Sequence, residues 1–138
     1  MEPILIDTGV IFALVDQDEW AHERCVRALQ IVTRPLVTCE AVITETCYLL
    51  RRRRGAVDAV LANVGNGFFG IPFKMSSTAP QIRAILEKYR DTPADLADAC
   101  LIAMADALDT GDILTLDSHF KHYRWRRTRR FNMLVPLD

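Results

Sequence analysis

The amino-acid sequence predicts an α/β protein of three layers, with helices on both faces of a central, mainly parallel sheet. Short apolar runs of strand character alternate with longer stretches of helical periodicity. Two of the runs end in an acid, and no repeat or Pro/Gly/Ser-rich linker divides the 138 residues. Because such alternation is typical of parallel sheets, we expect one domain over residues 1–138.

The first half of the chain is predicted to contain two short strands and several helices. The strands cover residues 3–7 and 36–38, which are mostly apolar. In the segments between and after them, apolar residues recur at intervals of three and four, which predicts helices with one buried face. The expected helices cover residues 9–15, 20–32, 40–53 and 56–65, and Gly65-Asn66-Gly67 is a signal that ends the last of them.

The second half is predicted to continue the alternation. Residues 69–73 form a strand candidate, and Pro72 favours the edge of the sheet because proline cannot donate a ladder hydrogen bond. The segment 92–95 is typical of a helix start, with Thr92 as N-cap, Pro93 as the first helical residue and Asp95 in third position. One helix is expected at 77–89, and a second runs from the 92–95 start to about Leu108. The last strands are expected at 113–116 and 132–136.

Acids stand at the ends of two predicted strands. Asp7 follows the run Ile4-Leu5-Ile6, and Asp117 follows the run 113–116. The carboxyl ends of parallel strands meet at the edge of the sheet where ligands bind, so these two acids are expected to lie close together. Glu45 and Asp98 sit inside apolar helical patterns and complete a candidate cluster. Such a cluster predicts a bound cation, because like charges at close range resist simultaneous ionisation.

Each acid also has an alternative, structural interpretation. Asp7 is a good residue for a helix N-cap, and Asp117 is suited to capping the turn that follows it. Glu45 is explained as well by a half-exposed helical stripe. Asp95 is predicted to be the capping-box acid of Thr92, whereas Asp98 lies a turn further on and has the weaker structural explanation.

Basic residues concentrate in two segments although the net charge is only −1. A single basic run is usually a solvated face, but two of them beside an acidic centre favour a polyanion-binding surface. Tyr123 and Trp125 lie in the second segment and either stack on bases or pack the tail onto the domain. The candidate polyanion-binding residues are Arg51, Arg52, Arg53, Arg54, Arg124, Arg126 and Arg127.

Composition and the start of the chain predict a cytoplasmic protein without a membrane span. Apolar residues make up 50% and charged residues 25%, as in globular proteins, and no apolar run reaches the ~20 residues of a membrane helix. The sequence enters its first strand without a secretory leader. No zinc-site spacing is present, which predicts reduced, buried thiols and surface or packing roles for the histidines. These residues are Cys25, Cys39, Cys47, Cys100, His22, His119 and His122.

Four short motifs, spread over essentially the whole chain, resemble those of the PIN-domain nucleases, and among them the VapC-type toxins of toxin–antitoxin pairs. Each motif alone is weak, but their order and spacing make the combination specific. The motifs are Ile4-Leu5-Ile6-Asp7-Thr8-Gly9, Ile43-Thr44-Glu45, Asp95-Leu96-Ala97-Asp98-Ala99 and Ile113-Leu114-Thr115-Leu116-Asp117.

The resemblance implies a PIN-like α/β/α fold and an endoribonuclease that depends on Mg²⁺ or Mn²⁺. A few carboxylates suffice for such an ion because Mg²⁺ keeps several waters. The arginine segments would hold the RNA backbone without choosing a sequence. The resemblance further implies a homodimer, silenced by a small antitoxin encoded nearby. The implied catalytic and metal-binding quartet is Asp7, Glu45, Asp98 and Asp117, with Thr8, Asp95 and Thr115 in support.

Two other functions fit parts of the sequence. Apolar-apolar-Asp-Thr-Gly is also the signature of aspartic proteases, but those are all-β proteins and would leave three of the four acids without a role. The second alternative is a non-catalytic or housekeeping PIN domain that binds RNA or a partner protein. Metal-dependent hydrolysis of RNA by the purified protein, with Asp7→Asn as control, separates this alternative from the nuclease.

Overall fold

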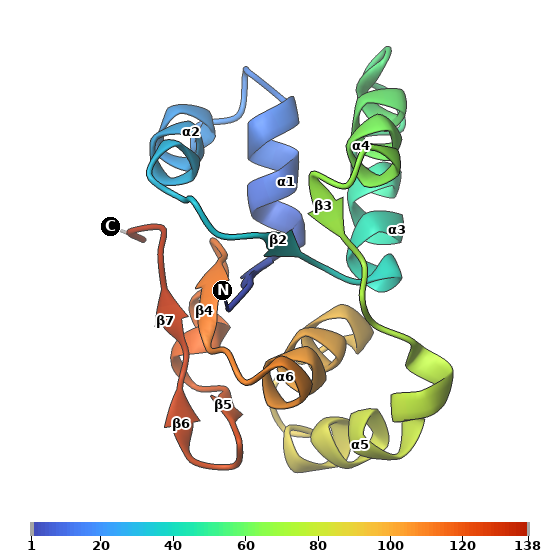
Figure 1. The fold of residues 1–138 in the computed structure, drawn as a ribbon, viewed down its shortest axis with the longest axis vertical. Helices are drawn as coiled ribbons and strands as arrows, with labels where there is room; N and C mark the ends of the chain where they lie inside the picture. The colour runs from blue at the N-terminus through green and yellow to red at the C-terminus, as the bar shows by residue number, and fades with distance from the viewer. Residues whose placement is uncertain (1, 138) are drawn as a thin grey trace.

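The computed structural model describes residues 2–137 as a parallel sheet between two groups of helices (Figure 1). The five strands of the sheet are β3 (Phe69–Gly70), β2 (Leu36–Val37), β1 (Ile4–Ile6), β4 (Asp112–Leu114) and β7 (Asn132–Met133), in that order. All neighbouring pairs are parallel. The predicted α/β class and parallel sheet are therefore confirmed, and so is the edge position of the strand that precedes Pro72.

In the described part of the chain, six α-helices cover the sheet. In Figure 1, α1 to α4 occupy the upper half of the molecule and α5 and α6 the lower half, so that helices lie on both faces as predicted. Such a mixed α/β architecture is incompatible with the all-β aspartic protease reading. The helices are α1 (Thr8–Val15), α2 (His22–Gln30), α3 (Glu40–Leu49), α4 (Ala56–Gly65), α5 (Met75–Lys88) and α6 (Leu96–Leu108).

The central strands explain why the acidic edge forms where the sequence predicts it. Leu5 pairs with Val37 on one side and with Ile113 on the other. Strands buried on both faces read as continuous apolar runs rather than as alternating ones. Because Ile6 pairs with Leu114, β1 and β4 end at the same level. The residues after both strands consequently leave the sheet at one edge.

The start of α6 differs from the prediction. Thr92 and Pro93 lie in a turn, and the helix begins at Leu96 with Asp95 as its N-cap. The Asp95 side chain accepts from the Asp98 amide at 2.9 Å, and the Asp98 side chain accepts from the Asp95 amide at 3.3 Å. Asp98 is thus the third-position acid of a capping box, a role that was predicted for Asp95.

The arginine run also differs from the prediction, which placed it in a helix over 40–53. Helix α3 ends at Leu49, and residues 51–54 form a turn that leads to Gly55. Gly55 has a φ of 77°, a left-handed conformation that glycine adopts without steric cost. The run therefore projects from one end of the α3–α4 hairpin as an exposed loop.

A short antiparallel hairpin of β5 (Arg124–Trp125) and β6 (Arg129–Arg130) follows the 3-10 helix η1 (Ser118–Lys121) and was not predicted. Trp125 packs against Gly111 so closely that a Cβ at Gly111 would lie 2.1 Å from the indole Nε1. Tyr123 and Trp125 are both buried. Of the two interpretations of these aromatics, packing onto the domain is the one the structure supports.

The thiols follow the prediction of buried, reduced cysteines. Cys25, Cys39 and Cys100 are buried, Cys47 is half-buried, and all four are free. Cys39 at the start of α3 and Cys100 on α6 are hydrogen-bonded to each other, which raises the pKa of Cys39. Across residues 2–137, every helix is too short or too polar to cross a membrane.

Candidate active site

A pocket of about 510 Å³ opens at the carboxyl ends of β1 and β4. Asp7, Glu45, Asp98 and Asp117 all line it, together with Thr8 and Asp95. One carboxylate oxygen from each of Asp7, Asp98 and Asp117 lies within 4.8 Å of the others. The structure therefore brings the whole predicted quartet to one pocket and three of its members to one point.

Asp7 is positioned by both the strand before it and the helix after it. It is the N-cap of α1, where Oδ1 accepts the Thr8 amide at 2.7 Å. Its other oxygen, Oδ2, accepts the Thr115 hydroxyl at 2.9 Å. Thr115 Oγ1 in turn accepts the Asp117 amide at 3.0 Å. The N-cap interpretation of Asp7 is thus correct, and it coexists with a place at the centre of the acidic cluster.

Asp98 is held by its capping box and by a residue that sequence reasoning did not connect to it. The buried hydroxyl of Tyr123 donates to Asp98 Oδ2 at 3.2 Å. Burial, followed by the charge of Asp98, raises the pKa of Tyr123, so that it remains a donor. No local signal in the sequence announces a contact between residues that are 25 positions apart.

Asp117 is oriented by its neighbour His119, for which only a surface or packing role was predicted. Asp117 caps η1, with Oδ1 accepting the His119 amide at 2.9 Å. The same oxygen forms a hydrogen bond of 2.7 Å with His119 Nδ1. The imidazole also stacks on Tyr123 and lines the acidic pocket. Its position two residues after a strand-end acid is the signal that could have identified it.

Glu45 lies across the pocket from the three aspartates and is not part of their close group. It is half-buried, as is Ala41 one turn earlier, and Leu49 one turn later is 50% exposed. The half-exposed stripe proposed for this face of α3 is therefore real. Glu45 is nevertheless near enough to contribute to the electrostatics of Asp7.

The cluster is electrostatically uncompensated. Burial, opposed by hydrogen bonds from Thr8 and Thr115, and supported by the charges of Asp117 and Glu45, raises the pKa of Asp7 to about 6. Burial and then the charges of Asp95 and Asp7 raise the pKa of Asp98 to about 7. Within residues 2–137, neither carboxylate forms an ion pair with a lysine or arginine.

These residues fit a divalent cation. The donor set consists of carboxylate oxygens, which hard cations prefer. A positive charge there would offset both the burial and the mutual repulsion that raise the pKa values of Asp7 and Asp98. Thr8 adds a hydroxyl, Oγ1, that is buried without a hydrogen-bond partner among the described residues. An unpaired buried hydroxyl beside such a cluster is consistent with a hydrated ion or a substrate oxygen in the pocket.

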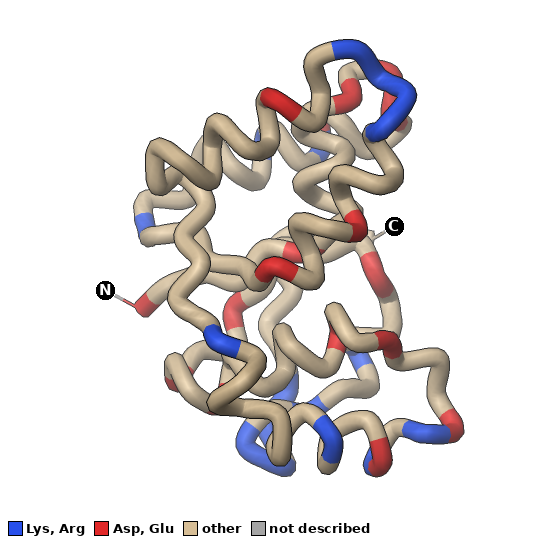
Figure 2. Tube along the Cα trace, turned by 90° about the vertical axis from the view of Figure 1, so that its right-hand side faces the viewer, with Lys and Arg blue, Asp and Glu red and all other residues tan. Residues whose placement is uncertain are grey.

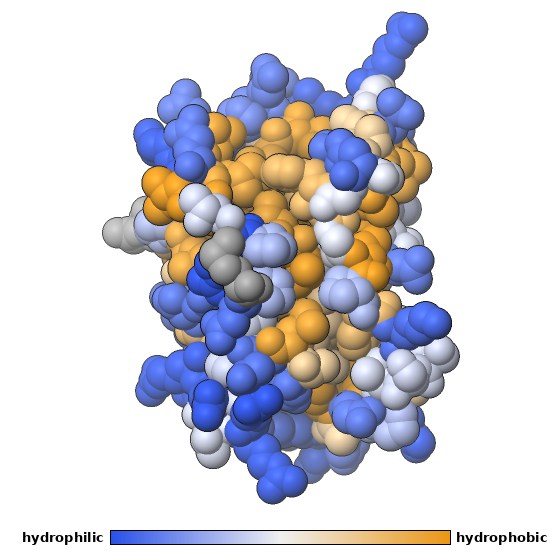
Figure 3. Space-filling view, viewed as in Figure 1, coloured by the Kyte–Doolittle hydropathy of each residue, from blue (hydrophilic) through white to orange (hydrophobic). Residues whose placement is uncertain are grey.

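The two basic segments lie at opposite ends of the molecule, with the acidic edge between them. Figure 2 shows the 51–54 turn and the β5–β6 hairpin at the two ends of the long axis. In Figure 3, strongly hydrophilic side chains crowd the lower left, where the hairpin lies in Figure 1. They are thus two separate surfaces.

Several of the candidate arginines are occupied by contacts within the protein. Arg53 forms ion pairs with Asp16 at 2.9 Å and Asp18 at 3.1 Å. Arg126 pairs with Asp109, and Arg124 donates to three nearby carbonyls. Arg51, Arg52, Arg54 and Arg127 are exposed and form no ion pair among residues 2–137, and of these Arg51 donates to the Tyr48 carbonyl at 2.7 Å.

Comparison with known proteins gives consistent results. A family model described as PIN domain matches residues 4–126. Ribonuclease VapC26 of Mycobacterium tuberculosis is 31% identical over 134 residues, covering 95% of this chain and 99% of that protein. The crystal structure of M. tuberculosis VapC20, described as a toxin that cleaves the sarcin-ricin loop, superposes with a TM-score of 0.81. It shares 21% sequence identity and covers 91% of this chain and 98% of its own, a likeness in fold.

Proposed function

The chain belongs to the PIN domain family, among the VapC-type ribonucleases, and on that premise we propose that it is a metal-dependent endoribonuclease acting as a type II toxin. The observation that carries the proposal is the convergence of Asp7, Asp98 and Asp117 within 4.8 Å. An acidic cluster that no lysine or arginine of residues 2–137 neutralises is suited to holding Mg²⁺ or Mn²⁺ against a phosphate. The nuclease domain is proposed to span residues 1–138.

In this proposal each aspartate of the close group has a defined orientation. The Thr115 hydroxyl holds Asp7 by donating to it, the Tyr123 hydroxyl holds Asp98, and His119 holds Asp117. Outer partners of this kind fix the direction of ligand oxygens and are nearly as important as the ligands. A bound Mg²⁺ or Mn²⁺ would supply Lewis-acid activation of water and neutralise the phosphate charge.

Glu45 has a different part in the hydrolysis. It faces the aspartates from α3 and stands outside their close group. We assign it the role of accepting a proton from the water whose oxygen attacks phosphorus. The ester P–O bond to the leaving oxygen breaks in the same step, and that oxygen takes up a proton from solvent to leave as an alcohol. Asp95 keeps the N-terminal turn of α6 in place through the capping box. The Thr8 hydroxyl is proposed to donate to a water or a phosphate oxygen in the pocket.

Partners follow from the same proposal. The substrate is RNA, and the exposed arginines contact its backbone. An antitoxin encoded nearby is proposed to cover the acidic pocket, where a basic residue of the antitoxin would compete with metal for the same carboxylates. A homodimer and a cytoplasmic location complete the proposal.

The test is hydrolysis of a mixed RNA pool by the purified protein with Mg²⁺ or Mn²⁺, with EDTA, and with the Asp7→Asn variant. Cleavage by the metal-supplied wild type only is the expected result. In cells, expression of the wild type alone should slow growth, and co-expression of the neighbouring gene should restore it. An intact wild type that binds RNA without cleaving it would identify a non-catalytic PIN domain, whereas cleavage without growth arrest would point to a housekeeping nuclease.

A further inference from the structure

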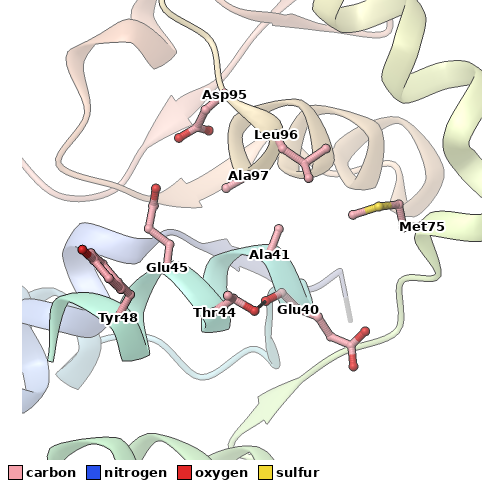
Figure 4. A pocket seen from close by; sticks show the side chains of 9 residues that line it. All are labelled: Glu40, Ala41, Thr44, Glu45, Tyr48, Met75, Asp95, Leu96 and Ala97. Atoms are coloured by element: carbon pink, nitrogen blue, oxygen red, sulfur yellow. Dashed lines mark hydrogen bonds between the residues drawn. The ribbon is translucent and has the colours of Figure 1, made fainter. Parts of the chain in front are cut away.

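A second cavity, of about 590 Å³, opens between α3 and the N-terminal turn of α6. Ala41 and Tyr48 of α3 line it on one side and Leu96 of α6 on the other. Figure 4 shows Met75 at one end of this groove and Tyr48 at the other. Glu45 lines both the groove and the acidic pocket, as does Asp95. The groove is therefore continuous with the candidate active site.

Tyr48 is an unusual residue for the exposed face of a helix beside a catalytic pocket. Tyr48 is 61% exposed. The guanidinium carbon of Arg51 lies 3.9 Å from the centroid of its ring. One face of the ring is thus covered by a cation, while the residue as a whole remains more than half exposed. Such a ring is a stacking platform, since every nucleobase presents a π-face to it.

The charges of the groove favour a base over a phosphate. The carboxylates that line it are Glu40, Glu45 and Asp95, which would repel a phosphate group. A base is uncharged, has two apolar faces that suit Ala41 and Leu96, and carries N–H groups at its edge that carboxylates accept. The volume lies in the usual range of small-molecule sites. A phosphate of the same nucleotide would reach the acidic pocket, which shares Glu45 and Asp95 with the groove.

We propose that this groove is a stacking subsite for one unpaired nucleobase of the RNA, adjacent to the phosphate that is cleaved. The inference rests on the ribonuclease function proposed above and adds a requirement to it. Cleavage then needs a nucleotide that is free to leave a base stack, so single-stranded loops are substrates and the same sequence in a duplex is a poor one.

The experiment measures kcat/KM on a short single-stranded RNA with one known cleavage point. An abasic nucleotide is introduced at each position in turn, up to three on either side of the cleaved bond. For the wild type, one position is expected to be special, with a loss of roughly 5- to 150-fold that corresponds to one base stack. The Tyr48→Ala variant should show this loss on the intact RNA and no further loss on the abasic RNA.

Three further variants give the matched controls. Tyr48→Phe keeps the ring and should behave as the wild type. Trp20→Ala removes another exposed aromatic with an arginine over its ring, Arg24 at 5.2 Å, from outside the groove, and should leave kcat/KM unchanged. Ala41→Trp fills the groove and should reduce cleavage of intact RNA to the level of abasic RNA. Circular dichroism verifies that each variant is folded.

The outcomes separate the inference from the function on which it rests. If the wild type cleaves no RNA, both are overturned. If it cleaves, and abasic substitutions cost wild type and Tyr48→Ala equally, only the subsite is overturned. Two other results also overturn the subsite. If Tyr48→Ala cleaves RNA normally but is no longer inhibited by the antitoxin, the groove is a protein-docking site. If Tyr48→Ala cleaves normally but changes its oligomeric state, the groove is a contact between copies of the chain.

Discussion

Asp7 and Asp16 stand at the two ends of α1 and are buried to nearly the same extent, 6% and 7% exposed. Asp16, at the C-terminal end, forms an ion pair with Arg53 of the 51–54 turn. Asp7, at the N-terminal end, receives only neutral donors from residues 2–137 and faces the carboxylates of Asp98 and Asp117.

The difference between these two ends separates an acid that is compensated by a cation from one that is not. A buried carboxylate that is paired with a cation is tolerated because the partner compensates for lost hydration, whereas an unpaired one costs free energy. The end of α1 that carries Asp16 is therefore compensated from within the fold. The end that carries Asp7 is left uncompensated, and a cation from solution would compensate it.

The largest effect is expected when the acid at one end of α1 is neutralised while the acid at the other end is kept. Asp7→Asn should lower the ribonuclease rate at saturating Mg²⁺ by roughly 100-fold or more, because even the outer partners of a metal ligand are worth 10- to 100-fold. Asp16→Asn, the same change on the same helix, should leave the rate within about twofold of wild type. Initial rates on one single-stranded RNA measure both, and equal losses would remove the distinction between the two ends.

A second change alters stability in a direction that depends on pH. The pKa of Asp98 is raised to about 7 in the folded protein against 3.8 for an ordinary aspartate. The unfolded chain then binds fewer protons than the folded one between roughly pH 4 and 7, so that the folded state loses stability as pH rises through this window. At pH 8 without metal, Asp98→Asn should be more stable than wild type, by on the order of a few kcal/mol, because the charge penalty at about 1.4 kcal/mol per pKa unit outweighs the weakened capping box.

At pH 4 the same variant should be the less stable one. The charge penalty is then absent, and the weakened capping box costs about 1 kcal/mol. Urea unfolding in EDTA at pH 4 and pH 8 measures both values. Asp112→Asn serves as the control, since Asp112 is paired with Arg34 at 2.7 Å. If Asp98→Asn were destabilised at both pH values, Asp98 would have to be regarded as a structural acid.

The paired end is tested by removing its cation. Arg53→Met leaves Asp16 buried without its partner and should reduce the free energy of unfolding by about 1–3 kcal/mol at pH 7. Arg52→Met, at an exposed neighbour, should change it by less than about 0.5 kcal/mol. Adding Asp16→Asn to Arg53→Met should restore part of the loss. Equal stabilities of the two single variants would show that the ion pair is without energetic weight.

What the sequence could predict follows from how local each signal is. The proximity of Asp7 and Asp117 was predictable because apolar runs identify parallel strands, and the carboxyl ends of such strands lie at the same edge of the sheet. The start of α6 was not, since Thr92 and Asp95 are both acceptable N-caps and only the reciprocal bonds with Asp98 decide between them.

Contacts between distant segments were out of reach for the same reason. Arg53 looked like one of four equivalent arginines, yet its partner Asp16 is brought to it only when α1 packs near the α3–α4 turn. Tyr123 looked like an aromatic that could stack on RNA, and only the folded hairpin shows it buried and bonded to Asp98. Periodicity reports which face of an element is buried, but it carries no information on which residue of another element lies opposite.

A smaller effect is expected when metal is added to the uncompensated end. A ligand at ten times its dissociation constant stabilises the folded state by about 1.4 kcal/mol. Millimolar Mg²⁺ or Mn²⁺ should therefore raise the melting temperature of the wild type at pH 7.5, and EDTA should reverse the shift. Asp16→Asn should respond in the same way and Asp7→Asn should not. An equal rise in Asp7→Asn would place the binding of metal outside the acidic pocket.

The smallest effects concern the arginines one by one, and they extend the comparison from acids to cations. Arg53 is committed to Asp16, whereas Arg51, Arg52, Arg54 and Arg127 are exposed without an ion pair among residues 2–137.

At roughly −0.7 per phosphate contact of a single strand, these four predict a slope of about −3 for log K against log salt. Binding is measured by fluorescence anisotropy with the Asp7→Asn variant, which is expected to bind RNA with little cleavage. Replacing Arg52 by serine should reduce the slope by about 0.7, because one released counterion is lost. Replacing Arg53 should change it much less, since its guanidinium already neutralises a carboxylate. If both replacements reduced the slope equally, Arg53 would leave Asp16 to contact phosphate, and the compensated end of α1 would itself be part of the RNA-binding surface.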